Sequence, residues 1–164
     1  MSKLIEFYNF RGKTQDGYSF EDIKMFSLDK LETCHSYIQW VFPLKERSKA
    51  VPSSPVLTSE DVEDIHKYKM ELFLIVNMLP FYGLVYNDKF EAIDRGPHWD
   101  ERKATWITPR NHNYLRLTRI LKSLCLLGMK PLAVKLRLCL NEIHEANRSD
   151  ISDITMQFWD EAIK

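Results

Sequence analysis

Residues 111–129 read NHNYLRLTRILKSLCLLGM, and this stretch decides the fold class. Its apolar residues recur at intervals of three and four, which is typical of one face of an amphipathic helix. They are Leu117, Ile120, Leu121, Leu124 and Leu127. Gly128 follows the last of them, at the position where a residue in the left-handed conformation often ends a helix. We therefore expect a long helix whose leucine face packs against a core.

Two more helices are predicted after this stretch. Residues 130–147 start again at Pro131, which suits a first helical turn because its fixed φ is already helical. Residues 150–163 form a last short helix, for which we expect three apolar anchors. These are Ile154, Phe158 and Trp159.

Helical patterns also dominate the first half of the chain. Ser19 precedes acidic residues as a helix cap would, and Thr58 or Ser59 does the same for residues 58–79. The pattern in residues 58–79 predicts four inward side chains, which are Leu72, Ile75, Val76 and Leu79. Residues 28–42 read as one helix, ended by the proline that follows.

The fold class that follows is all-α, a compact irregular bundle of about six helices. Patterns that alternate as in strands are nearly absent. Residues 88–109 are the least regular part, and we expect one long ordered loop there with at most a short helix. Such loops are often functional. Gly83 is predicted to let a neighbouring segment approach closely.

Length and composition indicate a single soluble domain over residues 1–164. No apolar run approaches a membrane span, and the first residues lack the apolar core of a signal peptide. The chain has three cysteines, an odd number without CxxC spacing, which indicates a reducing compartment with free thiols. We expect a cytoplasmic protein, with Cys125 and Cys139 buried and unreactive.

The net charge is zero, but the charge is unevenly distributed. Residues 1–101 hold 12 basic and 17 acidic residues, residues 102–141 hold nine basic and no acidic ones, and residues 142–164 hold two basic and six acidic ones. One interpretation is that the basic middle segment neutralises its acidic flanks in the folded chain. The other is a local anion site that the neutral total hides.

Signatures of known chemistry are missing. The sequence has no GxGxxG, GxxxxGK[ST], HExxH, GxSxG or paired CxxC motif. The five histidines are not spaced as metal ligands on one helix, and residues 98–101 (HWDE) suit a solvated loop better than a metal site. We therefore name no catalytic residue, no metal ligand and no cofactor.

Polar residues line one side of the predicted helix at 111–129, at intervals of four, three and four. They are His112, Arg116, Arg119 and Ser123. Asn111 or Asn113 would cap this helix, and a helix start beside two guanidinium groups favours a carboxylate or phosphate. Alternatively, the arginines pair with acidic residues of the flanks, such as Glu32 or Asp160.

Residues 35–44, HSYIQWVFPL, hold the other candidate residues. On a helix, His35 and Gln39 share an edge, and Trp40 lies near them. The interpretation we favour is a core helix whose polar groups bond to a neighbouring helix. The alternative is a polar pocket in which these three side chains face Asn111, His112, Arg116 and Arg119, with Trp106 as an apolar wall.

Three separated stretches resemble the conserved region of the opioid growth factor receptor family. They are HSYIQWVFPL at 35–44, LPFYGL at 79–84 and WITPRNHNYLRLTRILKSLCLLGM at 106–129. The family shows H-x-Y-I-Q-W-x-F-P-L, then F-Y-G, then N-H-x-x-L-R-x-T-R-I-L, in this order. The match covers nearly the whole chain, and the agreement of three motifs in order makes it specific.

The resemblance implies an α-helical domain. For the vertebrate receptor it also implies binding of a methionine-ending enkephalin pentapeptide, growth inhibition and a nuclear location. The repeat tail of the vertebrate receptor is not seen here, so we expect a stand-alone, single-domain member of the kind known from microbes. We do not transfer the enkephalin to this chain.

The leading functional hypothesis is a non-catalytic binding module, with a role in signalling. Its ligand would be an anionic small molecule or a peptide carboxylate, and its candidate residues are His35, Gln39, Trp40, Trp106, Asn111, His112, Asn113, Arg116 and Arg119. The alternative is nucleic-acid binding through the basic segment 102–141. A third hypothesis is an enzyme, for which no signature indicates a reaction. We expect no membrane partner, and the sequence leaves the oligomeric state open.

Overall fold

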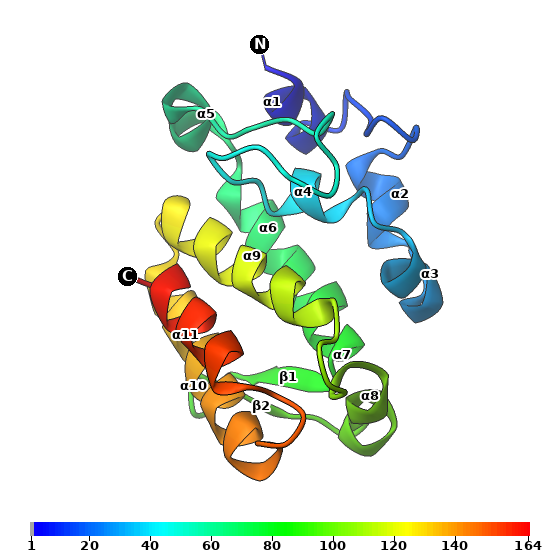
Figure 1. The fold of residues 1–164 in the computed structure, drawn as a ribbon. Helices are drawn as coiled ribbons and strands as arrows, with labels where there is room; N and C mark the ends of the chain where they lie inside the picture. Colours follow the sequence, from blue (N-terminus) through cyan, green and yellow to red (C-terminus); the bar gives the residue numbers. More distant parts are fainter. Residues whose placement is uncertain (1) are drawn as a thin grey trace. The chain divides into compact units, whose positions relative to one another are not determined.

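The computed structural model describes residues 2–164 (Figure 1). Its contacts divide the chain into two compact units, of which the first ends at Leu74 and the second runs from Ile75 to Lys164. The prediction of one domain over 1–164 stays a prediction. The chain is mostly helical, as expected, but the all-α prediction is wrong in detail, because there are more helices than six and a small two-stranded sheet.

The first unit consists of short helices joined by irregular segments. They are α1 (Lys3–Tyr8), α2 (Phe20–Lys24), α3 (Leu28–Thr33), α4 (Ile38–Val41), α5 (Ser59–Asp64) and α6 (Lys67–Phe73). Aromatic rings form its core, with Phe7 at 5.2 Å from Phe20 and 5.3 Å from Trp40 between ring centroids. Both capping predictions are confirmed: Ser19 and Thr58 each form a capping box with an aspartate three residues later.

The predicted helix over residues 28–42 is wrong as a single element, since α3 and α4 are separated by residues 34–37. Cys34 is extended at the end of α3, with ψ 119°. Side chains of the break bond to other parts of the chain: the Tyr37 hydroxyl donates to the Leu31 carbonyl at 2.9 Å, and the Ser36 hydroxyl donates to Asp16, twenty positions earlier. The helix does end before Pro43, as predicted.

The prediction of four inward residues in 58–79 holds for Leu79 and in part for Ile75, which is half-buried. It is wrong for Leu72 and Val76, which are 55% and 58% exposed. A π-helix, η1 (Leu74–Met78), continues from α6 and leads into α7 (Leu79–Phe81). Its wider turn changes the phase of the buried face, which a regular helical period does not anticipate. The buried residues of this stretch include Phe73, Leu74 and Met78.

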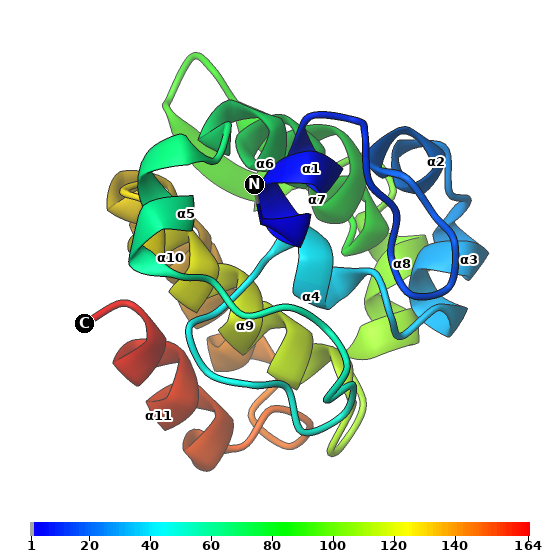
Figure 2. The ribbon, with the colours of Figure 1, turned by 90° about the horizontal axis from the view of Figure 1, so that it is seen from above.

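The second unit holds a hairpin and four longer helices. They are β1 (Leu84–Asn87), β2 (Ala92–Arg95), α8 (Trp99–Trp106), α9 (Asn113–Leu126), α10 (Lys130–Ala146) and α11 (Asp153–Ala162). Helix α9 packs on both α10 and α11, and β2 packs on α10 (Figures 1 and 2). The leucine face of α9 is buried as predicted, Gly128 has a φ of 77°, and Pro131 lies in the first turn of α10.

The prediction for residues 88–109 is met in part: the short helix expected there is α8, but the strand β2 takes the place of much of the long loop. The strands β1 and β2 pair antiparallel in the register Leu84↔Arg95 to Asn87↔Ala92, and an eight-residue helix, α8, follows. The Asn87 side chain accepts hydrogen bonds from the N–H groups of Lys89 and Phe90 and so closes the turn. Each strand has only four residues, too few to show an alternating pattern.

The prediction for Gly83 is confirmed. Its φ is +79°, and a Cβ atom there would lie 2.8 Å from Cβ of Arg102 and 3.1 Å from Cα of Trp99. Both residues belong to α8, so the missing side chain lets α8 fold back against the chain between α7 and β1.

The C-terminal helix α11 differs from the expectation in its buried face. Trp159 is fully buried, and its indole N–H donates to the Tyr114 carbonyl at 3.1 Å. Ile154 and Phe158 were predicted as anchors, but they are 64% and 55% exposed. Met156 and Ala162 pack inward with the tryptophan instead, since they lie three residues to either side of it.

An ion pair also ties α11 to α10. The Arg137 side chain is only 10% exposed, and its Nε and Nη2 atoms lie 2.9 and 2.6 Å from Asp160 Oδ1. The expectation that acidic flanks pair with the basic segment is thus met by Asp160, whose partner is Arg137. The pair encloses a charge that could not be buried alone.

We expect Asp160→Asn to lower the free energy of unfolding by about 1–2 kcal/mol, because it leaves the guanidinium of Arg137 buried without its counter-charge. The loss is limited because the Asp160 side chain is itself largely exposed to solvent. The matched control is Glu161→Gln, which removes only an exposed pair with Lys164 and should leave stability unchanged. Urea denaturation of both variants measures the difference; equal stabilities would contradict the role given to Arg137.

Candidate functional site

A cavity of about 180 Å³ lies where α9 begins, beside α11. Most of its lining comes from the start of α9 and the residues just before it, and the remainder comes from α11. The lining residues are Arg110, Asn111, His112, Tyr114, Leu115, Thr118, Thr155 and Phe158. The cavity therefore lies wholly within the second unit, and we name it the α9 cavity.

The chain enters α9 through an ordered polar turn. Arg110 has a φ of 57°, in the left-handed region. The Asn111 side-chain oxygen accepts hydrogen bonds from the Asn113 backbone N–H at 2.9 Å and the Asn113 side-chain amide at 3.0 Å. His112 stands at the N-cap position and makes no capping bond with its side chain. Of the two asparagines expected to cap, Asn111 thus satisfies a backbone donor of the first turn.

Tyr114 gives the α9 cavity a rigid, neutral wall. Its side chain is buried, and its hydroxyl donates to the Thr108 carbonyl at 2.7 Å. Burial, and next the negative charge of Asp150, raise the pKa of Tyr114 to about 12. Its own carbonyl accepts from the Thr118 hydroxyl at 3.0 Å. The tyrosine therefore stays protonated and cannot place a negative charge in the cavity.

The exposed residues that line the α9 cavity include both a cation, Arg110, and large apolar side chains. Arg110 is exposed, and within residues 2–164 its guanidinium forms no hydrogen bond or ion pair. The imidazole of His112 is exposed nearby. Leu115 and Phe158 also line the cavity and are 70% and 55% exposed, high fractions for such large apolar side chains. A ligand with a negative group beside an apolar one would match this surface.

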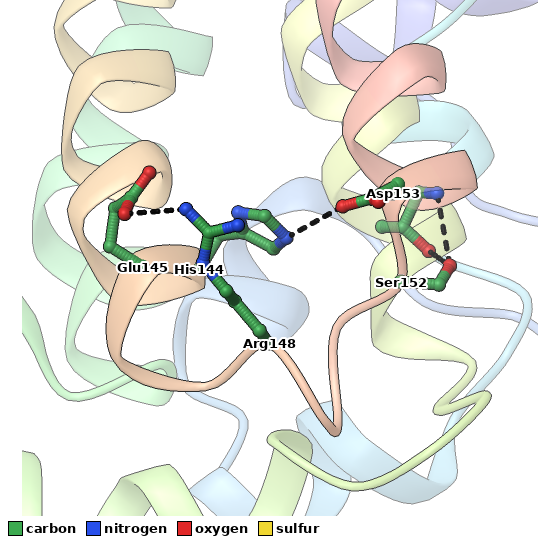
Figure 3. Close-up of polar contacts among 6 residues, drawn as sticks. His144, Glu145, Arg148, Ser152 and Asp153 are labelled. Carbon is green, nitrogen blue, oxygen red and sulfur yellow. Dashed lines mark hydrogen bonds and ion pairs between the residues drawn. The ribbon is translucent and has the colours of Figure 1, made fainter.

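The start of α11 is held against the end of α10, as Figure 3 shows. The buried imidazole of His144 points at Asp153, with Nε2 at 3.5 Å from Oδ1. The Ser152 hydroxyl accepts from the Thr155 N–H at 3.2 Å and so caps α11. An anion near a helix N-terminus is favourable, and Asp153 is the first residue of α11. These contacts fix the turn of α11 that supplies Thr155 to the α9 cavity.

The candidate residues of the second unit separate into lining and supporting positions. Asn111 and His112 line the α9 cavity, whereas Asn113 is fully buried and its side-chain oxygen accepts from the Tyr82 hydroxyl at 3.3 Å. Arg116 is 6% exposed and Arg119 is half-buried, and neither lines this cavity.

Trp106, expected as an apolar wall, is a core residue. It is fully buried, its indole N–H donates to the Tyr82 carbonyl at 3.0 Å, and its ring packs edge-on against the rings of Tyr82 and Trp99. It therefore does not line the α9 cavity.

The three candidate residues of the first unit lie around the break between α3 and α4. Gln39 and Trp40 are buried: the Gln39 side-chain amide donates to the His35 carbonyl at 3.0 Å, and the Trp40 indole N–H donates to the Gln15 side-chain oxygen at 2.7 Å. His35 is exposed and lines a different cavity. That these residues share a pocket with Arg116 and Arg119 stays a prediction.

The sequence reasoning missed six of the eight lining residues. Arg110 could have been found, since it directly precedes the predicted cap. The sequence analysis named Arg116 and Arg119 instead, because they recur at helical spacing. Leu115 and Phe158 were not recognised as surface, because an apolar residue in an amphipathic helix is expected to be buried.

The described part of the chain shows neither a candidate metal site nor a candidate membrane span. No three His, Cys, Asp or Glu side chains of residues 2–164 are grouped so that they could hold a metal ion. Among the same residues, no helix is both long and apolar enough to span a membrane.

The second unit is thus a helical unit whose α9 cavity has both polar and apolar lining. Comparison with known proteins shows the family. The chain matches the family described as the opioid growth factor receptor (OGFr) conserved region over residues 2–164, and it belongs to this family. The resemblance seen in the three sequence stretches is thereby confirmed. No solved structure matches the chain.

Several curated proteins are similar to this chain. Opioid growth factor receptor-like protein 1 of Xenopus tropicalis is 40% identical over 131 residues, which cover 74% of this chain and 25% of that protein. The mouse protein of the same name is 41% identical over 104 residues, 61% of this chain and 22% of that protein. The human opioid growth factor receptor is 38% identical over 111 residues, 62% of this chain and 16% of the receptor. The chain thus spans a quarter or less of these relatives.

Proposed function

We propose that this chain is a non-catalytic binding module that takes a carboxylate ligand, such as the C-terminus of a peptide, in the α9 cavity. The observation that carries the proposal is that one cavity combines the guanidinium of Arg110, which has no partner among residues 2–164, with the exposed apolar side chains of Leu115 and Phe158. A peptide that ends in an apolar residue presents the two matching groups: a carboxylate for the guanidinium and, on the same residue, a side chain for the apolar surface.

The physical chemistry supports a carboxylate in particular. A guanidinium group can donate two parallel hydrogen bonds to a carboxylate, and the start of a fourteen-residue helix adds a favourable field. The volume of about 180 Å³ is below the ~300–1,000 Å³ of sites that enclose a drug-sized ligand. It suits a small anion or the last residue of a peptide rather than a whole peptide.

The family supports a binding role as well. Several relatives are named as a receptor for an opioid growth factor, and a receptor binds its ligand. The resemblance implies a methionine-ending peptide for the vertebrate receptor. Methionine is a suitable test residue, because a thioether chain adapts well to apolar surface such as that of Leu115 and Phe158.

Nucleic-acid binding through residues 102–141 has less support. Several basic side chains of this segment serve the fold instead. Arg137 pairs with Asp160, Lys103 pairs with Asp100, Lys135 donates to the Tyr86 hydroxyl, and Arg102 donates to the Phe81 carbonyl. A basic surface for phosphates needs cations that are free to contact them.

We expect a fluorescein-labelled pentapeptide ending in a methionine carboxylate to bind at least about tenfold more tightly than its C-terminal amide, a ratio that corresponds to about 1.4 kcal/mol. Arg110→Gln should remove this preference, because it removes the charge that distinguishes acid from amide. Fluorescence anisotropy measures both affinities.

Arg148→Gln is the matched control, since Arg148 is also exposed in the second unit but pairs with Glu145 and does not line the cavity. It should keep the preference for the acid. Equal binding of acid and amide by the unaltered chain would contradict the proposal. Tight binding of a short DNA or RNA duplex that falls steeply with salt would favour the alternative.

A further inference from the structure

A second cavity, in the first unit, has a chemistry that the proposed function does not use. Its volume is about 310 Å³, and it is lined by Asp16, Tyr18, Lys30, Thr33, Cys34, His35, Ser36 and Val51. A thiol, an ammonium group and a carboxylate thus share one open cavity. We propose that Cys34 is a modification site, which forms a mixed disulfide with a small zwitterionic thiol compound.

Cys34 is placed to react. It is half-buried at the end of α3, where the backbone turns from helical to extended. Its Sγ atom lies 3.5 Å from the Ser36 hydroxyl oxygen, and the Ser36 hydroxyl donates to Asp16. This chain of polar groups orients the thiol at the cavity wall, so that a ligand within the cavity can reach the sulfur.

The other two thiols lie in surroundings that suppress reaction. Cys139 is buried, and burial, followed by the charge of Glu142, raises the pKa of its thiol to about 12. Cys125 is half-buried, and burial also raises the pKa of its thiol. Since the thiolate is the attacking species, both should react slowly. The expectation of burial thus holds for Cys139, whereas Cys125 is only half-buried.

The charges on the cavity wall select the class of reaction partner. Lys30 offers a cation, and hydrogen bonding to Tyr18, with smaller contributions from the charges of Tyr18, Cys34 and Asp16, raises the pKa of its ammonium group. Lys30 therefore stays charged and can hold a carboxylate of the ligand. Asp16 is exposed and offers an anion for an amino group. Glutathione and cysteine carry both groups beside a sulfur.

The chemistry is thiol–disulfide exchange, and its co-reactant is a small symmetric disulfide such as glutathione disulfide. Cys34 loses its proton to solvent, and the thiolate attacks one sulfur of the disulfide. The bond between the two ligand sulfurs breaks as the new bond to Cys34 Sγ forms. The second half leaves as a thiolate and takes up a proton, so Cys34 is oxidised and the released thiol is reduced.

The test is intact-mass spectrometry of the full chain over time, with peptide mapping, after addition of glutathione disulfide or of the neutral bis(2-hydroxyethyl) disulfide. We expect one glutathionyl group on Cys34, added about tenfold faster than on Cys125. Lys30→Gln should lower the ratio of the glutathione rate to the neutral rate about threefold or more, because only glutathione carries the charges that the cavity recognises.

Lys30→Arg keeps the cation and should keep that ratio, and Cys34→Ser should abolish the fast modification. Circular dichroism of each variant checks that the fold is retained. Modification of Cys125 as fast as of Cys34, or a rate ratio that Lys30→Gln leaves unchanged, would overturn the proposal. The binding test in the α9 cavity is independent of either result.

Discussion

Trp106→Ala should lower the free energy of unfolding by about 3–5 kcal/mol, the usual range for removing a buried tryptophan. The side chain is fully buried at the end of α8, and its ring packs at 5.2 Å from that of Tyr82 and 6.1 Å from that of Trp99. Its indole N–H donates to the Tyr82 carbonyl, so the substitution also leaves a buried acceptor without its partner.

Chemical denaturation followed by circular dichroism measures this loss. The matched control is Phe158→Ala, which truncates an aromatic side chain that is 55% exposed and should change stability by less than about 0.5 kcal/mol. Phe158→Ala should instead weaken binding of the methionine carboxylate probe. Equal stability losses for the two variants would contradict the role of the Trp106 side chain in the core.

Gly83→Ala should cost about 2–4 kcal/mol of unfolding free energy. A left-handed φ of +79° is unfavourable for alanine by about 1–2 kcal/mol, and the new methyl group would lie 2.8 Å from Cβ of Arg102, closer than real Cβ atoms approach. The chain before β1 and the helix α8 would have to move apart, and the bond from Arg102 Nε to the Phe81 carbonyl would be strained with them.

The control for this prediction is Gly17→Ala. Gly17 has a similar φ of +88°, but no heavy atom lies within 4 Å of the position of its Cβ. Only the backbone term remains there, so thermal denaturation should show a loss of about 1–2 kcal/mol. If both alanine variants lose the same stability, the close approach of α8 to Gly83 contributes nothing.

The elements with long, regular patterns could be predicted from the sequence. The leucine face of α9, its end at Gly128 and the restart of α10 at Pro131 follow from spacing and local backbone preferences, and the structure confirms all three. The caps at Ser19 and Thr58 were predictable for the same reason, because a capping box depends on residues only three positions apart.

What could not be predicted depends on contacts between distant residues. The break at residues 34–37 is accompanied by a bond from Ser36 to Asp16, twenty positions earlier in the chain. The hairpin strands of four residues each are too short for a pattern. The exposure of Phe158 follows from which side of α11 meets α9, and a helix with apolar residues on two sides does not show this in its sequence.

The site was predictable to the same degree. Asn111 and His112 were found because a helix start is recognisable and can favour anions. Arg116 was named for its helical spacing, yet its side chain is buried. Arg110 and Phe158 line one cavity because α9 packs on α11. This is a tertiary contact, which the local sequence pattern does not indicate.

The carboxylate site in the α9 cavity is best tested by an NMR titration of the ¹⁵N-labelled chain with N-acetylmethionine, observed by amide chemical shifts. We expect the largest shifts at residues 110–118 and 153–158, and none of comparable size when the amide of N-acetylmethionine is added. Shifts concentrated elsewhere, or equal shifts for acid and amide, would contradict a carboxylate site in the α9 cavity.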